Sequence, residues 1–257
     1  MSQRDRYEPG VPCFVATMQP DPKAATEFYG AVLGWEFEEG NVFVARLRGK
    51  PVAAITPLAP SVEPPPAPAW ITDVAVASAD EVAGKTRVAG GTVLAEPFEG
   101  PAGRMTVIKD PTGGVVAACE RTTGAQLVNE FGAWAMSSLS TPDPEAAAAF
   151  YGAVFGWTTE TFEMGDVSAT MFRLPGYVGG EPSQPVSREV VATMMRGEEA
   201  GWMVDFWVHD VDAAVAAAQE RGGRALAGPF DTPIGRQAVL TDPAGVPFSI
   251  TRVAQAG

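Results

Sequence analysis

An internal repeat covers most of the chain, and it limits the possible folds more than any other feature of the sequence. The stretch FYGAVLGW at residues 28–35 returns as FYGAVFGW at residues 150–157, which is 122 positions later. An Asp-Pro pair stands seven residues before each copy, at Asp21 and Asp143. Because self-similarity at a fixed spacing marks duplicated structural units, the sequence predicts two equivalent domains.

The second half of each copy repeats with a different spacing. The offset between Trp70 and Trp202 is 132 residues, and the GR and DP pairs further on keep this offset. The second copy therefore holds ten additional residues, within 174–201. The Gly, Pro and polar content of this segment predicts a loop, longer than the extended, proline-rich loop at residues 61–69 of the first copy.

Each copy divides into two units of the same plan, in which a short strand leads into a helix and three extended segments follow. The helix is clearest in DPKAATEFYGAVLG, where an Asp N-cap and a Pro precede apolar residues at helical spacing and a Gly ends the pattern. The sequence therefore predicts an α+β fold of four βαβββ units. We divide it into tandem domains at residues 1–125 and 126–257.

These units carry a family resemblance. The pattern DP..A..FYGAV.GW in the first unit of each copy, with GR....DP.G near the end of the second, resembles the vicinal oxygen chelate superfamily over residues 11–253. Glyoxalase I, extradiol dioxygenases, fosfomycin-resistance enzymes and bleomycin-binding proteins share this fold. The resemblance implies curled, partly open mixed sheets that hold a divalent metal through His, Glu or Gln, and the metal chelates two adjacent substrate oxygens.

The positions that this resemblance assigns to metal ligands hold other kinds of side chain. They are Phe14, Ile71 and Ala117 in the first domain, and Met136, Met203 and Ser249 in the second. None of these side chains is a good ligand for a hard or borderline divalent ion. Since His209 is the one histidine in the chain, a site with two histidines is impossible. The sequence therefore predicts no metal and no other cofactor.

A repeated aspartate, Asp73 and Asp205, lies two residues beyond one ligand position in each domain. Because strands alternate faces with a period of two, both carboxylates are expected to point into the curled sheet. Such a carboxylate could accept a hydrogen bond from a ligand, act as a general base or contribute one oxygen to a metal. The alternative is an ion pair inside the fold with Arg104 or Arg236, which are repeated as well.

The second domain offers the better ligand-binding surface. Its candidates combine flexible apolar side chains, an aromatic ring and polar groups; they are Met136, Met203, Asp205, Trp207 and Ser249. The first domain contributes Phe14, Ile71 and Asp73.

Unmatched side chains give further expectations. Trp134 and Trp207 have no aromatic counterpart in the first copy, so they are expected at a ligand surface. His209 follows the end of a strand and is expected at the rim. Cys119 is predicted to face inward and Cys13 outward, which makes a disulfide between them implausible. Both are therefore expected to be buried free thiols.

Composition excludes several partners. With a formal net charge of −13 and a pI near 4.5, the chain would repel a phosphate backbone, so nucleic acid is not expected. No apolar run approaches the roughly 20 residues of a membrane span, and the charged first residues do not form a secretory signal. We therefore expect a cytoplasmic monomer or homodimer that binds a small molecule.

Three functions remain open. The first is metal-free binding of a small hydrophobic or planar organic molecule, as in the antibiotic-sequestering, bleomycin resistance-like members of the superfamily. The second is a metal-independent enzyme of a hydroxylase- or lyase-like type, in which Asp205 or Asp73 moves a proton on a bound carbonyl or phenol. The third is a non-catalytic scaffold with an acidic contact surface.

Overall fold

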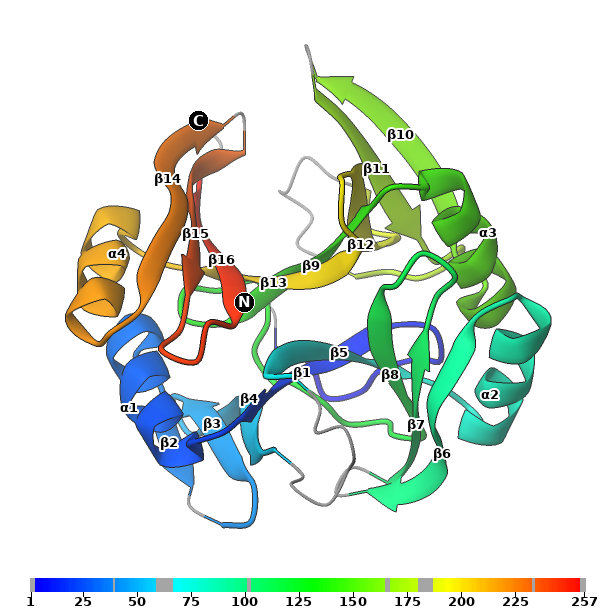
Figure 1. Cartoon of the computed structure of the whole chain (residues 1–257), viewed down its shortest axis with the longest axis horizontal. Coiled ribbons are helices and arrows are strands. Elements are labelled where there is room, and N and C mark those ends of the chain that lie inside the picture. The colour runs from blue at the N-terminus through cyan, green and yellow to red at the C-terminus, as the bar shows by residue number, and fades with distance from the viewer. Residues whose placement is uncertain are drawn as a thin grey trace.

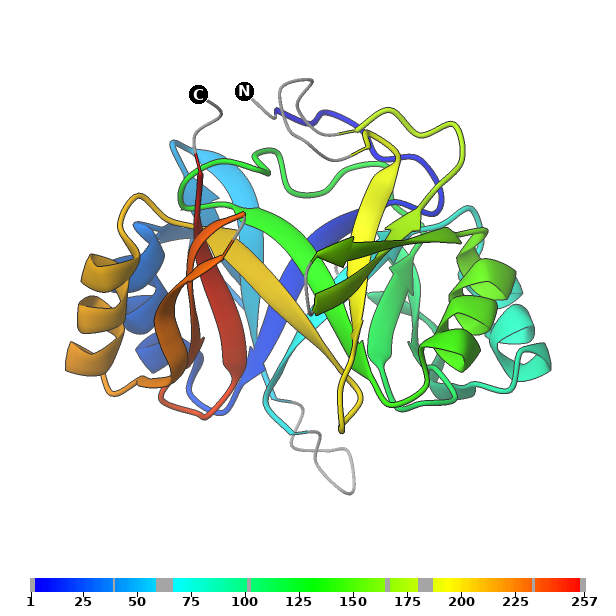
Figure 2. The same cartoon turned by 90° about the horizontal axis from the view of Figure 1, so that it is seen from above.

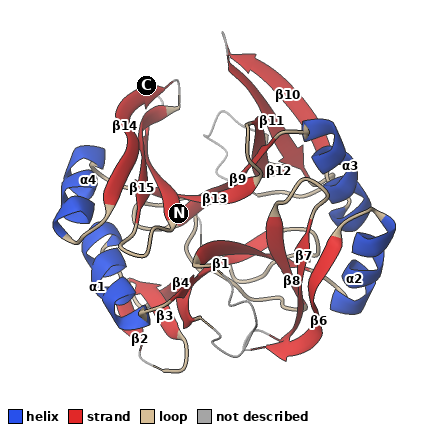
Figure 3. Cartoon of the chain, in the orientation of Figure 1, coloured by secondary structure: helices blue, strands red, loops and turns tan. Residues whose placement is uncertain are grey.

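The computed structural model describes residues 3–38, 40–58, 67–100, 103–164, 167–179, 187–232 and 234–254. Within these ranges the chain repeats one order four times, a strand, a helix and three strands, as predicted (Figure 1 and Figure 3). The helices are α1 (Pro22–Leu33), α2 (Ala79–Val88), α3 (Pro144–Phe155) and α4 (Val211–Glu220). None of the described helices is both long and apolar enough to cross a membrane.

The strands form two eight-stranded mixed sheets, one from each copy of the repeat. The first has the order β2-β3-β4-β1-β5-β8-β7-β6 and contains β1 (Pro12–Gln19), β2 (Glu36–Glu38), β3 (Phe43–Leu47), β4 (Lys50–Pro57), β5 (Ala69–Ala75), β6 (Thr92–Gly100), β7 (Gly103–Lys109) and β8 (Val115–Cys119). The second has the order β10-β11-β12-β9-β13-β16-β15-β14 and contains β9 (Trp134–Thr141), β10 (Thr158–Met164), β11 (Val167–Arg173), β12 (Val190–Arg196), β13 (Gly201–Trp207), β14 (Arg224–Thr232), β15 (Gly235–Thr241) and β16 (Pro247–Val253). The predicted α+β class with two tandem domains is confirmed.

Both sheets are strongly curved, and their convex backs face each other at the centre of the molecule (Figure 1). There β13 of the second sheet contacts β5 and β8 of the first. The helices cover the outer flanks, with α1 beside α4 on one side and α2 beside α3 on the other (Figure 1 and Figure 2). The hydrophobic core therefore lies between the sheets and under the helices, and each sheet keeps a concave face directed away from its partner.

The ends of α1 follow from the sequence around them. The side chain of Asp21 accepts a hydrogen bond from the backbone N–H of Ala24, and Pro22 occupies the first turn, where its missing N–H has no cost. Gly34 ends the helix with φ of 73°, a left-handed conformation that glycine adopts without strain. The second copy caps α3 in the same way, so the predicted helix boundaries are confirmed.

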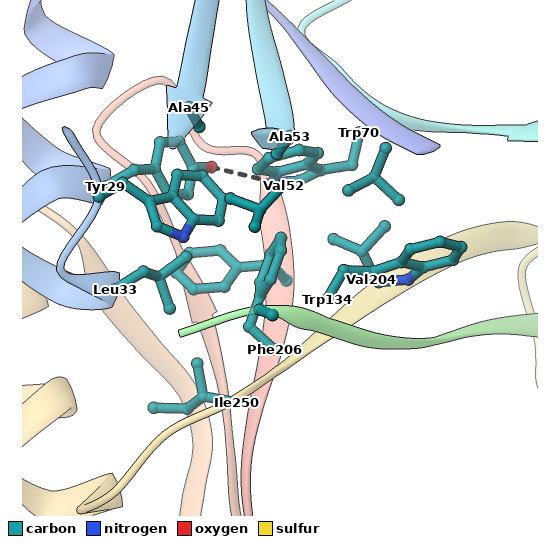
Figure 4. Close-up of a cluster of buried hydrophobic side chains, with 14 of the residues drawn as sticks. Tyr29, Leu33, Ala45, Val52, Ala53, Trp70, Trp134, Val204, Phe206 and Ile250 are labelled. Atoms are coloured by element: carbon teal, nitrogen blue, oxygen red, sulfur yellow. Dashed lines mark hydrogen bonds between the residues drawn. The ribbon is translucent and has the colours of Figure 1, made fainter. Parts of the chain in front are cut away.

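The first octapeptide, at residues 28–35, forms aromatic contacts between the two domains. The ring of Tyr29 lies 5.5 Å from that of Phe248, and the ring of Trp35 lies 5.3 Å from that of Phe206, measured between centroids. Figure 4 shows Tyr29 and Trp70 from the first domain gathered with Phe206 from the second. Because aromatic side chains bury large apolar areas, this cluster holds the two sheets back to back.

Hydrogen bonds between the repeated motifs decide which units pair. The hydroxyl of Tyr29 donates to Oδ2 of Asp242, and the hydroxyl of Tyr151 donates to Oδ2 of Asp110. Each tyrosine belongs to an FYG stretch, and each aspartate to a DP pair of the other domain. The first unit therefore binds the fourth, and the second unit binds the third.

One element differs from the prediction. Residues 174–201 were expected to form a loop, but they contain β12, which pairs with β9 and β11. The run VVATMM has the β-branched and apolar content of a strand, which the Gly, Pro and charged residues around it obscured in the composition of the whole segment. Residues 180–186, and residues 61–66 of the predicted proline-rich loop, lie outside the described residues.

Candidate functional site

The first concave face has a floor that is closed to solvent. Asp73 on β5 is in register with Phe14 on β1 and with Ala117 on β8, and strand alternation places Ile71 and Cys119 on the same face. Ile71 is partly exposed, whereas the exposed fraction of each of the other four is 8% or less. Four of the five inward-facing side chains are therefore not available to a ligand in this conformation.

Arg121, just beyond β8, covers this floor. Its guanidinium carbon lies 4.8 Å from the ring centroid of Phe14, and its Nη1 lies 3.5 Å from Oδ2 of Asp73. Burial raises the pKa of Asp73 to about 6, while Arg121 and a hydrogen bond from the thiol of Cys119 oppose that rise. Asp73 is thus held in a buried ion pair.

The predicted ion pair of each repeated aspartate with Arg104 or Arg236 is wrong. Arg104 binds the carboxylate of Asp80 on α2 through two hydrogen bonds of 2.7 and 2.9 Å, and Arg236 binds Asp212 on α4 at 2.8 and 2.9 Å. The physical reason is strand parity. Arg104 shares its face of β7 with the fully buried Ile108, whereas the neighbouring Met105 is in register with the inward-facing Cys119, so Arg104 faces the helix-covered convex side.

The second concave face is accessible at its floor. Asp205 on β13 is in register with Met136 on β9 and with Ser249 on β16, and alternation places Met203 and Trp207 on the same face. All five side chains are partly exposed. The structure therefore brings the five predicted residues of the second domain together on one surface that solvent reaches.

Two hydroxyl groups bind Asp205. Oγ of Ser249 donates to Oδ1 at 2.7 Å, and Oγ1 of Thr251 donates to the same oxygen at 2.8 Å. The side-chain amide of Gln237 on β15 donates to Oγ1 of Thr251 at 3.1 Å. Partial burial at the floor of the curved sheet raises the pKa of Asp205 to about 6, and the two hydroxyls oppose that rise. In the described part of the chain no arginine or lysine pairs with Asp205, which distinguishes it from Asp73.

Thr251, Gln237 and Arg121 were not among the site residues predicted from the sequence. The first two stand at the repeat positions of Cys119 and Met105, at the offset of 132 residues. A comparison of inward-facing positions between the two copies would have found Thr251 and Gln237. The first copy has a thiol and a thioether at these positions, whereas the second copy has a hydroxyl and an amide.

The prediction that Trp134 lies at a ligand surface is wrong. Its exposed fraction is 5%, and it belongs to the core between the sheets (Figure 4). A register shift between β9 and β13 pairs Trp134 with the buried Phe206, which turns the indole to the convex side. His209 is exposed, and its ring centroid lies 3.9 Å from that of Phe131. Cys13 and Cys119 are buried free thiols, as predicted.

The residues present do not fit the divalent ion that the resemblance implies. The six expected ligand positions hold aromatic, aliphatic, thioether and hydroxyl side chains. Among the described residues no group of three His, Cys, Asp or Glu side chains could hold a metal ion. Among the described residues, Asp205 binds two hydroxyl groups and lies opposite a methionine, and hydroxyl and thioether groups are weak or mismatched ligands for such an ion.

Known proteins match this chain along its whole length. The model of the family described as glyoxalase-like domain matches residues 14–119 and 122–251. The Mycobacterium tuberculosis protein CFP32, which is named provisionally as a glyoxylase, is 38% identical, and the match covers 99% of both chains. The Streptomyces peucetius anthracycline biosynthesis protein DnrV is 30% identical, over 96% of this chain and 95% of its own.

Two solved structures share the fold. The Mn(II)-bound glyoxalase from Novosphingobium aromaticivorans superposes with a TM-score of 0.62 at 16% identity, covering 95% of this chain and 82% of that chain. The 2,3-dioxygenase LapB from Pseudomonas sp. KL28 has a TM-score of 0.62 at 13% identity, covering 97% of this chain and 94% of its own. At these identities the likeness concerns the architecture alone.

Proposed function

Because this chain belongs to the glyoxalase-like domain family, we propose its function from the two concave faces that the fold provides. It binds a small hydrophobic or planar organic molecule on the second face, without a metal ion. The difference between the faces supports this proposal. Arg121 closes the floor of the first over Asp73, whereas Asp205 and its neighbours on the second remain partly exposed.

The side chains of the second face suit a flat, apolar ligand. Met136 and Met203 are flexible and polarisable, so they adapt to the outline of a ligand, and Trp207 offers an aromatic ring. Phe230 on β14 is in register with Gln237 and is 40% exposed, which adds a second ring toward the edge of the sheet. Apolar surface covered here would stabilise a complex by about 25 cal/mol per Å².

The relatives support the same class of ligand. DnrV and the Streptomyces protein DauV, each 30% identical to this chain, are named as anthracycline biosynthesis proteins. Anthracyclines are planar polycyclic aromatic compounds, and a protein that handles them needs an apolar surface with a few polar groups.

The test is a binding measurement after metal removal. Protein dialysed against EDTA is titrated with 1-naphthol, with cyclohexanol as the non-aromatic control, and binding is followed by tryptophan fluorescence and melting temperature. We expect saturable binding of 1-naphthol that EDTA does not change. Trp207→Ala should weaken it about tenfold, which corresponds to roughly 1.4 kcal/mol.

Phe98→Ala is the control for the first face, because Phe98 is a 41% exposed ring on β6 of the first sheet, at the repeat position of Phe230. It should bind 1-naphthol as the wild type does. A stoichiometric metal whose removal abolishes binding would overturn the metal-independent proposal. A loss in Phe98→Ala with none in Trp207→Ala would move the ligand to the first face.

Asp205 also favours a second candidate, a metal-independent enzyme. A carboxylate with a pKa raised to about 6, on a face that solvent reaches, is suited to accept a proton near neutral pH. Turnover of a bound phenol or carbonyl compound, lost in Asp205→Asn while binding persists, would support this candidate. Asp73 is not proposed as the base, because its carboxylate lies buried against Arg121.

A further inference from the structure

The hydrogen bonds around Asp205 all run in one direction. Gln237 donates to Thr251, Thr251 donates to Oδ1 of Asp205, and Ser249 donates to the same oxygen. A serine or threonine hydroxyl carries a single proton. Oγ of Ser249 lies 2.7 Å from Oδ1 and 3.4 Å from the carbonyl oxygen of Val204, so its proton goes to the closer carboxylate oxygen, as does the proton of Thr251. Oδ1 therefore has its donors fixed by the protein.

The other oxygen, Oδ2 of Asp205, receives no hydrogen bond from any residue that the structure describes. At the equivalent position of the first domain, Oδ2 of Asp73 has a partner within the protein, the guanidinium of Arg121. An ionised carboxylate can only accept, and an accepting group that loses its partner on burial costs about 1–3 kcal/mol. Whatever covers Asp205 must therefore bring a proton donor to Oδ2.

We propose that Oδ2 of Asp205 accepts a hydrogen bond from a hydroxyl group of the ligand, and that the ligand is an aromatic compound with a phenolic or enolic hydroxyl. This inference rests on the proposed binding function and adds the chemical class of the ligand to it. A hydroxyl donating to a carboxylate forms a short, charge-assisted bond. An ether or carbonyl oxygen in its place would meet the carboxylate with lone pairs and be rejected.

The neighbours of Asp205 favour an aromatic carrier for that hydroxyl. Met136 stands directly across from Asp205 on β9, and Trp207 lies two residues further along β13 on the same face. Apolar surface therefore lies beside the carboxylate on both strands. A ligand ammonium could also donate to Oδ2, but its desolvation beside methionine and tryptophan side chains is more costly than that of a neutral hydroxyl.

Two probes that differ at one group test this assignment. 1-Naphthol carries the donor, and 1-methoxynaphthalene replaces it by an acceptor on the same ring system. We expect wild-type protein at about pH 8 to bind 1-naphthol at least about tenfold more tightly than its ether. Equal dissociation constants would overturn the hydroxyl assignment and leave the proposed binding function standing. If neither probe binds, the result counts against both the hydroxyl assignment and the proposed binding function.

Asp205→Asn reverses the polarity of the site. Its carbonyl oxygen can keep the hydrogen bonds from Ser249 and Thr251, which places an NH₂ donor where Oδ2 was. The preference for 1-naphthol should vanish or invert toward the ether. A preference that persists in this variant would overturn the assignment.

Asp73→Asn makes the same substitution at the repeat-equivalent position and should keep the wild-type preference. Melting temperatures show whether each variant is folded, and the wild-type comparison of the two probes needs no variant.

A third probe, 1-naphthylmethylamine, separates the donor classes. Tighter binding of this amine than of 1-naphthol would replace the hydroxyl by a cation as the group that Asp205 recognises.

Discussion

The hydroxyl of Tyr151 in the second domain donates a hydrogen bond of 2.8 Å to Oδ2 of Asp110 in the first. Oδ1 of the same carboxylate accepts hydrogen bonds from the backbone of residues 112–114. One side chain therefore shapes its own turn and binds the opposite domain. Tyr29 and Asp242 form the equivalent bond at 3.0 Å. The FYG and DP motifs recur because each copy needs a partner in the other.

Removing these hydroxyls should destabilise the protein to different extents. Tyr151→Phe deprives Oδ2 of Asp110 of its donor, and we expect it to lower the free energy of unfolding by about 2–3 kcal/mol. Tyr29→Phe should cost only about 1–2 kcal/mol, because Gln19 still donates to Oδ2 of Asp242 at 2.6 Å. Urea unfolding of both variants measures the difference. Equal losses would show that Gln19 does not compensate for the missing hydroxyl.

Arg121 should be coupled to Asp73 in a double-mutant cycle. Arg121→Met keeps an unbranched apolar side chain near Phe14 but leaves the buried carboxylate without a cation. We expect a loss of about 3 kcal/mol in the free energy of unfolding at neutral pH. Asp73→Asn with Arg121→Met removes both charges and should recover most of that loss. Strictly additive effects would show that the two groups do not interact.

Asp205 should make the protein less stable as pH rises across a defined window. Its pKa is raised from 3.8 to about 6 in the folded state, so between these values the folded protein binds more protons than the unfolded one. The free energy of unfolding therefore falls as pH rises through this window, and the contribution is constant above it. Asp205→Asn removes this contribution.

Urea unfolding at about pH 4.5 and pH 7.5 compares the wild type with Asp205→Asn. We expect the drop in unfolding free energy between the two conditions to be smaller in the variant, by an amount on the order of 1 kcal/mol. Asp73 remains in both proteins and serves as the internal reference for a second buried carboxylate. Identical pH profiles would mean that Asp205 titrates as an ordinary exposed acid.

The repeat made the fold and the second concave face predictable. Two copies of one pattern fixed four βαβββ units, and the period of two along a strand placed Met203, Asp205 and Trp207 on one face. These inferences succeeded because they depend on regular backbone geometry within single strands.

Features that depend on irregular backbone or on distant partners could not be predicted. Trp134 faces the core because a register shift breaks the alternation along β9, and no feature of the amino-acid sequence predicts that shift. Arg121 follows β8 and reaches Asp73 from 48 positions away. The pairing of Tyr29 with Asp242 was also hidden, because the same motifs would allow a bond within one domain.

The preference of the wild-type protein for 1-naphthol over 1-methoxynaphthalene should depend on pH. Above a pH of about 6 the carboxylate of Asp205 is ionised and accepts the ligand hydroxyl. Below this value Oδ2 carries a proton and becomes a donor, so it should favour the ether oxygen instead. The groups presented to Asp205 by β9 and β16 are Met136, Ser249 and Thr251, none of which titrates in this range.

Both probes stay uncharged from about pH 4.5 to pH 8, so a change in the ratio of their dissociation constants reports on the protein. Asp205→Asn should give a flat ratio across this range, and a wild-type ratio that stays equally flat would mean that Asp205 does not contact the hydroxyl.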